Sequence, residues 1–190
     1  MLSEFNLIVS TTRDYESQCE NEVWFNLNAL GDSSPIVSRP GIPGLILVKT
    51  TVAARRFVAY LREYMLQDPD YIQFILKVYP IDVVVETDLE MIQQATVNLV
   101  QTHPYAQDPS KKYRVTIRKR QCELTTDQLI AKIASQIPHA VSLKQYDWIL
   151  EVEIVNRFTG LAILKDEEIF QPIREKRLTG TELEKKPEID

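Results

Sequence analysis

Apolar positions in the first half of the chain recur with a period that changes between strand-like and helix-like spacing. Short apolar or β-branched runs are typical of buried strands, and apolar residues three or four positions apart are typical of one face of a helix. The predicted strands cover 4–12, 36–38, 45–49 and 74–86, and the predicted helices run from Asp14 to about Gly31 and over 52–67. The pattern therefore predicts the order βαββαβ for this half.

The second half gives a different order, αβαββ. Its predicted elements are a helix over 88–102, a strand over 111–120, a helix after a capping box at 125–128, and strands over 148–155 and 161–164 that are joined by a turn at Thr159 and Gly160. Trp24 and Trp148 both lie on apolar faces, so we expect them in the core. The sequence predicts an α+β protein with domains at 1–86 and 87–170, followed by a charged, flexible tail at 171–190.

The stretch KKYRVTIRKR, residues 111–120, combines strand alternation with a high positive charge. From Asp108 to Arg120 there are six Lys or Arg residues and one acid. Tyr113, Val115 and Ile117 would face one side, with the cations mainly on the other. One interpretation is a nucleic-acid surface, because a row of cations can follow a phosphate backbone. The alternative is a half-solvated strand whose Arg114 and Arg118 are neutralised by Glu151 and Glu153 of a neighbouring strand.

Composition and charge narrow the class of protein. The chain has 190 residues, 44% of them hydrophobic, and a net charge of −5. The net charge is −6 over 1–104, +4 over 105–165 and −3 over 166–190, which indicates modules with separate surfaces. No apolar run approaches the ~20 residues of a membrane span. Two cysteines far apart favour reduced thiols and a cytoplasmic location.

Candidate catalytic residues lack partners in the sequence. His103 and His139 have no neighbour at metal-ligand spacing, and no His or Asn pattern supports Cys122 as a nucleophile. Glu151 and Glu153 have a spacing that glycosidase chemistry could use, but neutralising arginines across the sheet explains them better. No glycine-rich phosphate loop is present, so we expect no nucleotide cofactor, no metal and no catalytic activity.

The sequence resembles a known family at these motifs. YRVTIRKR at 113–120, AVSL at 140–143 and WILEVEIVNRFTGLAIL at 148–164 resemble a THUMP domain, a small RNA-binding module of tRNA-modifying proteins. FNLIVSTTRDYE, GLILVKT and VYPIDVVVETDLE are similar to the ferredoxin-like domain that precedes it. The resemblance covers roughly 4–170. Lys144–Asp147 departs from it, because family members often have an Asn-Pro-Asp-like turn there, and the acidic total is a second departure.

The resemblance implies a function as well as a fold. It is strongest to the small THUMP adaptors of tRNA cytidine acetylation, which implies a non-catalytic protein that holds the tRNA acceptor end for a separate RNA cytidine acetyltransferase forming N4-acetylcytidine. No DNA and no membrane are expected as partners. The residues expected to contact RNA are Lys111, Lys112, Arg114, Arg118, Lys119, Arg120, Arg157 and Arg13. The alternatives are a THUMP subunit serving a methyltransferase or sulfur-transfer enzyme, and a protein-interaction module without RNA binding.

Overall fold

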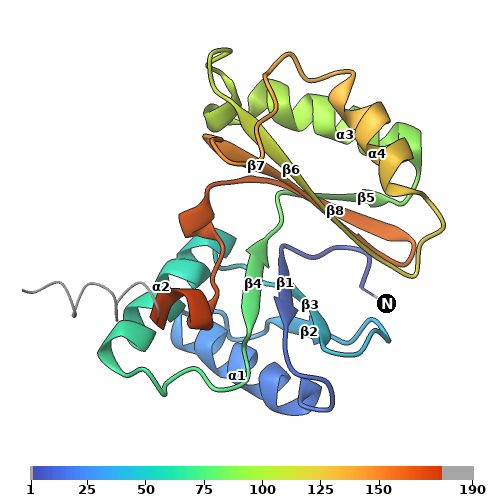
Figure 1. The fold of residues 1–190 in the computed structure, drawn as a ribbon. Coiled ribbons are helices and arrows are strands. Elements are labelled where there is room, and N and C mark those ends of the chain that lie inside the picture. Colours follow the sequence, from blue (N-terminus) through green and yellow to red (C-terminus); the bar gives the residue numbers. More distant parts are fainter. Residues whose placement is uncertain (1, 177–190) are drawn as a thin grey trace, which may run out of the picture.

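The chain forms two four-stranded sheets, each covered on its outer face by helices (Figure 1). The computed structural model describes residues 2–176. Helices and strands occur in both halves, which confirms the predicted α+β class.

The first sheet comes from the first half of the chain and has the order β2-β3-β1-β4, with all neighbours antiparallel. Its elements are β1 (Leu7–Ser10), α1 (Glu16–Ala29), β2 (Ile36–Ser38), β3 (Leu45–Lys49), α2 (Ala54–Gln67) and β4 (Lys77–Pro80). The predicted order βαββαβ is the observed one. The description of this half as a ferredoxin-like domain stays a prediction.

The second sheet has the order β5-β8-β7-β6, in which β6 and β7 are parallel and the other pairs antiparallel. Its elements are β5 (Val83–Glu86), α3 (Leu89–Thr102), the 3-10 turn η1 (Pro104–Ala106), β6 (Tyr113–Arg120), α4 (Thr126–Ala134), β7 (Trp148–Val155), β8 (Phe158–Leu164) and the 3-10 turn η2 (Asp166–Glu168). The predicted capping box is present, since Thr125 accepts from the Gln128 backbone and Gln128 accepts from that of Thr125.

Central strands of both sheets are buried on both faces. In β1, Leu7 and Val9 belong to a hydrophobic cluster with residues of α1 and α2, while Ile8 points to the second sheet. In β7, Leu150 packs with residues of α3 and α4, while Ile149 joins the cluster that contains Ile8. The protein therefore has four layers, helix, sheet, sheet and helix, and a separate hydrophobic cluster fills the space between the sheets.

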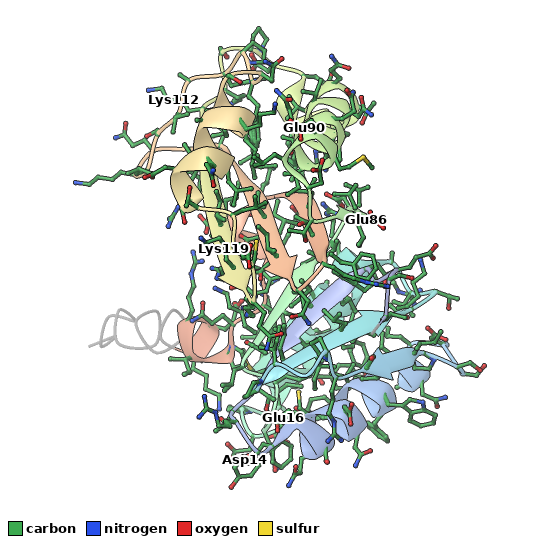
Figure 2. The ribbon with its side chains drawn as sticks, turned by 90° about the vertical axis from the view of Figure 1, so that its right-hand side faces the viewer. Asp14, Glu16, Glu86, Glu90, Lys112 and Lys119 are labelled. Atoms are coloured by element: carbon green, nitrogen blue, oxygen red, sulfur yellow. The ribbon has the colours of Figure 1, made fainter. Side chains whose placement is uncertain are left out.

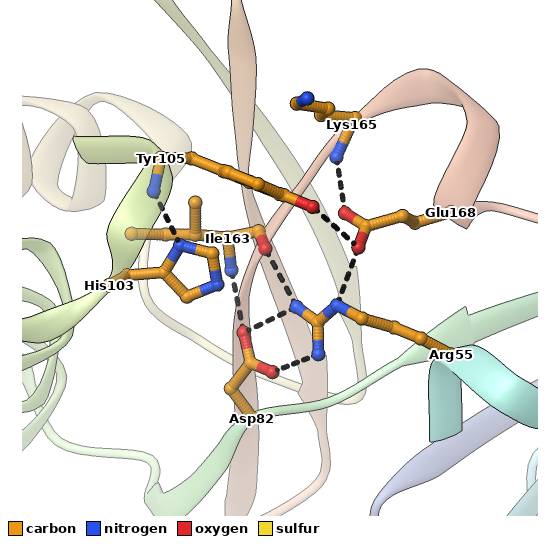
Figure 3. Close-up of polar contacts among 7 residues, drawn as sticks. All are labelled: Arg55, Asp82, His103, Tyr105, Ile163, Lys165 and Glu168. Atoms are coloured by element: carbon orange, nitrogen blue, oxygen red, sulfur yellow. Dashed lines mark hydrogen bonds and ion pairs between the residues drawn. The ribbon is translucent and has the colours of Figure 1, made fainter. Parts of the chain in front are cut away.

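A polar cluster ties the two halves together at one end of this interface (Figure 3). Arg55, in the first turn of α2, places Nη1 2.7 Å from Asp82 Oδ1 and Nε 2.7 Å from Glu168 Oε1. Its Nη2 also donates to the Ile163 carbonyl at 2.9 Å. Tyr105 donates from its hydroxyl to Glu168 at 3.1 Å. One guanidinium thus connects α2 to the β4–β5 link, to β8 and to η2.

The predicted single strand over 74–86 is wrong. The chain forms β4 and then β5, which lie in different sheets. Between them the Asp82 amide donates to the Leu161 carbonyl at 2.9 Å, although Leu161 is paired with Val83. Two residues of one strand therefore oppose one of the other, which is a β-bulge, and the bulge lies where the chain passes between sheets. The domain boundary at residue 86 stays a prediction, and β5 on its N-terminal side is a strand of the second sheet.

The turn expected at Thr159 and Gly160 is also misplaced. The β7–β8 turn contains Asn156 and Arg157, with Asn156 at φ +56°, and both predicted turn residues lie inside β8. Gly160 is needed there for a different reason. A Cβ at this position would lie 3.0 Å from the Phe5 ring and 3.1 Å from Ile81, so the glycine permits close approach between layers.

Of the two tryptophans predicted in the core, Trp148 is fully buried and Trp24 is 45% exposed. The buried stripe of α1 is Cys19, Val23 and Leu27. Trp24 follows Val23 and is rotated ~100° from it around the helix, so it lies outside that stripe.

The segment predicted as a tail, 171–190, begins with residues that contact the first half. Phe170, just before it, is buried and bridges to Val78 of β4. Residues 172–176 are helical, and Glu175 accepts from Arg62 of α2 at 2.8 Å. The rest of the predicted tail, 177–190, lies outside the described residues.

Candidate nucleic-acid interface

The basic strand is β6, and it forms one edge of the second sheet. Tyr113, Val115 and Ile117 point to the cluster under α3 and α4, as the alternation predicts. Arg118 and Arg120 lie on the other face, which looks toward the first sheet. These two arginines of β6 therefore face the boundary between the halves. The strand is not an open cationic surface along its whole length.

The C-terminal half of β6 is neutralised by two buried carboxylates of β7. Glu151 and Glu153 are 1% and 0% exposed. Arg118 contacts both, with Nη1 3.0 Å from Glu153 Oε1, and Arg120 contacts Glu153. The sequence predicted that the glutamates neutralise Arg114 and Arg118. The prediction is confirmed for Arg118, whereas the second arginine that pairs with them is Arg120 and not Arg114. The parallel register explains this, because Arg118 lies beside Glu153 and Arg120 is the next cation on that face.

The surroundings of Glu151 shift its pKa. Burial raises the pKa of Glu151 from its ordinary 4.5 to about 8, and repulsion by Glu153 adds to the shift while Arg118 opposes it. Burial tends to lower the pKa of Arg118, but the charges of Glu151 and Glu153 outweigh it and the pKa is raised. A guanidinium paired with carboxylates in this way attracts a phosphate less strongly, because the neighbouring negative charges offset its own.

The N-terminal end of β6 is more open. Lys111 Nζ lies 3.0 Å from Asp147 Oδ1, in an exposed ion pair that raises the pKa of Lys111, chiefly through the side-chain hydrogen bond. The Asp147 carboxylate also accepts from the Lys112 backbone at 2.8 Å. The Lys112 side chain is exposed and, among the described residues, has no ion pair. Asp147 thus holds the backbone just before β6 in place, and the Lys112 side chain remains available to contact a ligand.

Arg114 contacts an aromatic ring instead of a carboxylate. Its guanidinium carbon lies 5.6 Å from the centroid of Tyr146. Lys165 lies close by in the fold, with Nζ 4.5 Å over the Tyr105 ring. Lys165 also lines a pocket of about 300 Å³, together with Pro104, Tyr105, Asp108, Lys111 and Asp147. Sequence reasoning missed Lys165, because it follows β8 and joins Lys111 only through the fold.

The remaining predicted residues are dispersed. Lys119 is exposed and donates from Nζ to the Leu124 carbonyl at 2.6 Å. Figure 2 shows Lys112 and Lys119 on the same side of the second half. Arg157 lies in the β7–β8 turn over the Phe158 ring, and this turn reaches the first half where Asn156 donates to the Pro40 carbonyl at 3.2 Å. Arg13 lies on the first half, in a pocket with Asp14, Glu16 and Arg39.

Candidate catalytic residues do not converge. His103 accepts from the Tyr105 amide, and burial lowers its pKa. His139 packs edge-on against Tyr113 and Trp148. Within residues 2–176, no group of three or more His, Cys, Asp and Glu side chains is placed to hold a metal ion. No helix in this part of the chain is long and apolar enough to cross a bilayer.

Comparison with known proteins identifies the second half. Residues 86–164 match the family described as the THUMP domain. The match runs from the last residue of β5 to the end of β8. The comparison with curated proteins gives no match.

Several solved structures share the fold. The crystal structure of PH1313 from Pyrococcus horikoshii is 20% identical with a TM-score of 0.61, over 83% of this chain and 53% of that one. TrmN from Thermus thermophilus is 12% identical with a TM-score of 0.53, over 83% and 44%. A 4-thiouridine synthetase solved with RNA and ATP is 14% identical with a TM-score of 0.52, over 88% and 42%. The chain thus spans about half the length of these proteins or less.

Proposed function

We propose, on the premise that residues 86–164 of this chain are a THUMP domain, that the protein binds tRNA through the exposed edge of β6. The finer proposal is that it holds the acceptor end and presents the tRNA to a separate RNA cytidine acetyltransferase that forms N4-acetylcytidine. The family match supports the RNA-binding part. The acetylation part follows from the resemblance of the motifs described above.

The observation that carries the proposal is the unequal neutralisation of the cations on β6. Arg118 and Arg120 are occupied by Glu151 and Glu153, whereas Lys112 and Arg114 have no carboxylate partner among the described residues. We therefore propose that the RNA backbone lies along the N-terminal end of β6, with Lys111, Lys112 and Arg114 as principal phosphate contacts. Phosphate contacts position the RNA without reading its sequence.

The other predicted cations have smaller proposed roles. Lys119 and Arg157 would extend the contact toward the β7–β8 turn, and Arg13 would reach the RNA from the first half. Arg118 and Arg120 would contribute long-range attraction while their main contacts remain with the glutamates. Tyr146 and Tyr105 offer rings close to Arg114 and Lys165, and a single-stranded end could stack on such rings.

We also propose that this chain does not itself catalyse the modification. The support is the dispersion of His103, His139 and Cys122, which form no site with each other in the described residues. Chemistry would then reside in the partner enzyme. Reconstitution tests this point, because acetyl transfer from acetyl-coenzyme A should need both proteins, and turnover by this chain alone would contradict the proposal.

A salt titration tests the RNA surface. The affinity for tRNA is measured between about 50 and 200 mM salt for wild type and for a Lys112→Gln, Arg114→Gln double variant. Each lost phosphate contact should reduce the slope of log affinity against log salt by ~0.7–0.9. A Lys49→Gln, Arg56→Gln double variant is the matched control, because it removes two exposed cations of the first half. Equal slopes for all three proteins, each folded, would overturn the proposed surface.

A further inference from the structure

The sheet of the second half has a second edge, formed by β5, that faces away from the basic strand. In its antiparallel pairing with β8, the Thr87 amide bonds to Arg157 and the Asp82 amide to Leu161. Hydrogen-bonded and non-bonded pairs alternate along antiparallel strands, so counting back from Thr87 shows that Val85 and Val83 also bond to β8, and the Asp82 bond is the additional one of the bulge. The amide and carbonyl of Val84 therefore point outward. No other strand of residues 2–176 pairs with this edge.

An apolar groove runs beside this open edge. It lies between β5 and α3, with a volume of about 420 Å³, and is lined by Val83, Val85, Met91, Gln94, Ala95, Asn98, Leu99 and Thr102. Met91 is 50% exposed. A groove between an edge strand and a helix is the geometry into which an extended peptide is added as an extra strand, with backbone bonds to the edge and side chains in the groove.

The edge has few features that would keep other strands away. Natural edge strands are commonly protected by lysine, proline or a bulge. β5 begins with three consecutive valines and contains neither lysine nor proline. The bulge lies only at the beginning of the strand, at Asp82. An unprotected valine edge beside an apolar groove is expected to be covered by a partner.

The charge around the groove indicates the chemistry of that partner. No lysine or arginine occurs between Lys77 and Lys111. Glu86 and Glu90 lie at this side of the molecule, opposite to Lys112 and Lys119 (Figure 2). Lys132 of α4 pairs with Glu90 at 3.2 Å, and no described cation pairs with Glu86. An occupant with apolar residues at alternate positions and basic residues at its ends would match the groove and its rim.

We propose that the β5–α3 groove docks an extended segment of a partner protein, which adds a strand to β5, places alternate apolar side chains in the groove and directs Lys or Arg toward Glu86. The inference goes beyond the proposed function, because it requires no RNA. The basic edge and the docking edge lie on opposite sides of one sheet, so both could be occupied at once.

The experiment uses the full chain, labelled with ¹⁵N, and a synthetic peptide, acetyl-KVTVRVTVK-amide. We expect amide shift changes confined to β5 and α3, with slowed hydrogen exchange at Val84. The acidic peptide acetyl-EVTVEVTVE-amide should bind at least tenfold more weakly. Changes that fall elsewhere, or none at millimolar peptide, would overturn the proposal.

Two variants localise the effect. Val84→Pro removes the outward amide while leaving the ladder to β8, and Met91→Arg places a positive charge at the groove. Each should weaken binding of the basic peptide about tenfold. Leu143→Arg is the matched control, because Leu143 is 72% exposed and lies on another loop. Wild-type affinity in a folded Met91→Arg variant would overturn the proposal even if Val84→Pro failed to fold. Affinity for tRNA is measured on Val84→Pro and Met91→Arg and should not change, so that the two proposals fail independently.

Discussion

Arg118 of β6 places its guanidinium carbon 4.7 Å from the centroid of the Tyr79 ring of β4. The same guanidinium contacts Glu151 and Glu153. A cation from the second sheet therefore lies between an aromatic ring of the first sheet and two buried carboxylates of its own. The contact explains why part of a basic strand can stabilise the fold.

Replacing Arg118 by Gln should destabilise the protein by about 2–4 kcal/mol, because it removes one of the two cations that compensate the buried Glu153 carboxylate. The lower end allows for an Arg118 side chain that is 33% exposed. Urea unfolding measures the change. Arg114→Gln is the control and should cost less than about 1 kcal/mol; a similar loss for both variants would contradict the division of roles along β6.

The raised pKa of Glu151 predicts a dependence of stability on pH. The folded protein keeps a proton up to about pH 8, whereas the unfolded chain releases it near 4.5. The native state therefore binds more protons between these values, and stability should fall as pH rises, by at most ~1.4 kcal/mol per pH unit. In Glu151→Gln the free energy of unfolding should decrease less with pH, so that the variant becomes more stable relative to wild type as the pH approaches 8. An unchanged pH profile in the variant would show that Glu151 is already ionised in the folded protein.

Asp147→Asn should lower the stability of the fold and strengthen the electrostatic part of tRNA binding. The carboxylate holds Lys111 and accepts from the Lys112 backbone. Its loss should lower stability slightly, because the Lys111 ammonium and the Lys112 amide lose a charged hydrogen-bond acceptor. It should also make the tRNA salt slope steeper by up to ~0.9, because Lys111 becomes available to a phosphate. A shallower slope in the variant would mean that Asp147 positions the RNA-binding cations and does not compete for them.

Arg55→Gln tests the polar cluster of Figure 3, in which Arg55 contacts Asp82, Glu168 and the Ile163 carbonyl. We expect a loss of roughly 2–3 kcal/mol, since several charge-assisted hydrogen bonds disappear together. Faster amide exchange in β5 and η2 should accompany it. The neighbouring exposed Arg56→Gln is the control and should change stability by less than ~0.5 kcal/mol. Equal effects at both positions would show that the cluster adds nothing.

Gly160→Ala should cost about 1–3 kcal/mol through overpacking. Its new Cβ would press on Phe5 and Ile81 of the first half. Thermal unfolding measures the loss, and a variant as stable as wild type would show that the two layers can separate slightly without cost.

Much of the fold follows from periodicity. Both ends of β2, β3 and β7 and the C-terminal end of β6 agree with the pattern, because these ends coincide with a change of period or with turn residues, whereas β6 begins two residues later than predicted. The division of 74–86 could not be predicted this way. Apolar residues occur on both sides of Ile81, and only the pairing partners, β1 for one part and β8 for the other, decide which sheet each part joins.

The site is less predictable than the fold. Alternation shows that Arg114, Arg118 and Arg120 share a face, but not that this face looks toward another sheet. Arg118 is neutralised and Arg114 is not because of the register of β6 on β7, and that register is set by tertiary packing. Lys165 joins Lys111 around one pocket although the two are far apart in sequence.

The two-sided burial of the first sheet has a consequence for synthesis of the chain. The four strands of that sheet are complete once Pro80 has been made, but Ile8, Leu47 and Tyr79 on its inner face are covered by residues from 149 onward. At ~5–20 residues per second, this apolar face would wait roughly 4–15 s for its cover. We therefore expect a nascent chain of this protein to expose an aggregation-prone apolar face during that interval, even though its first half already has all four of its strands.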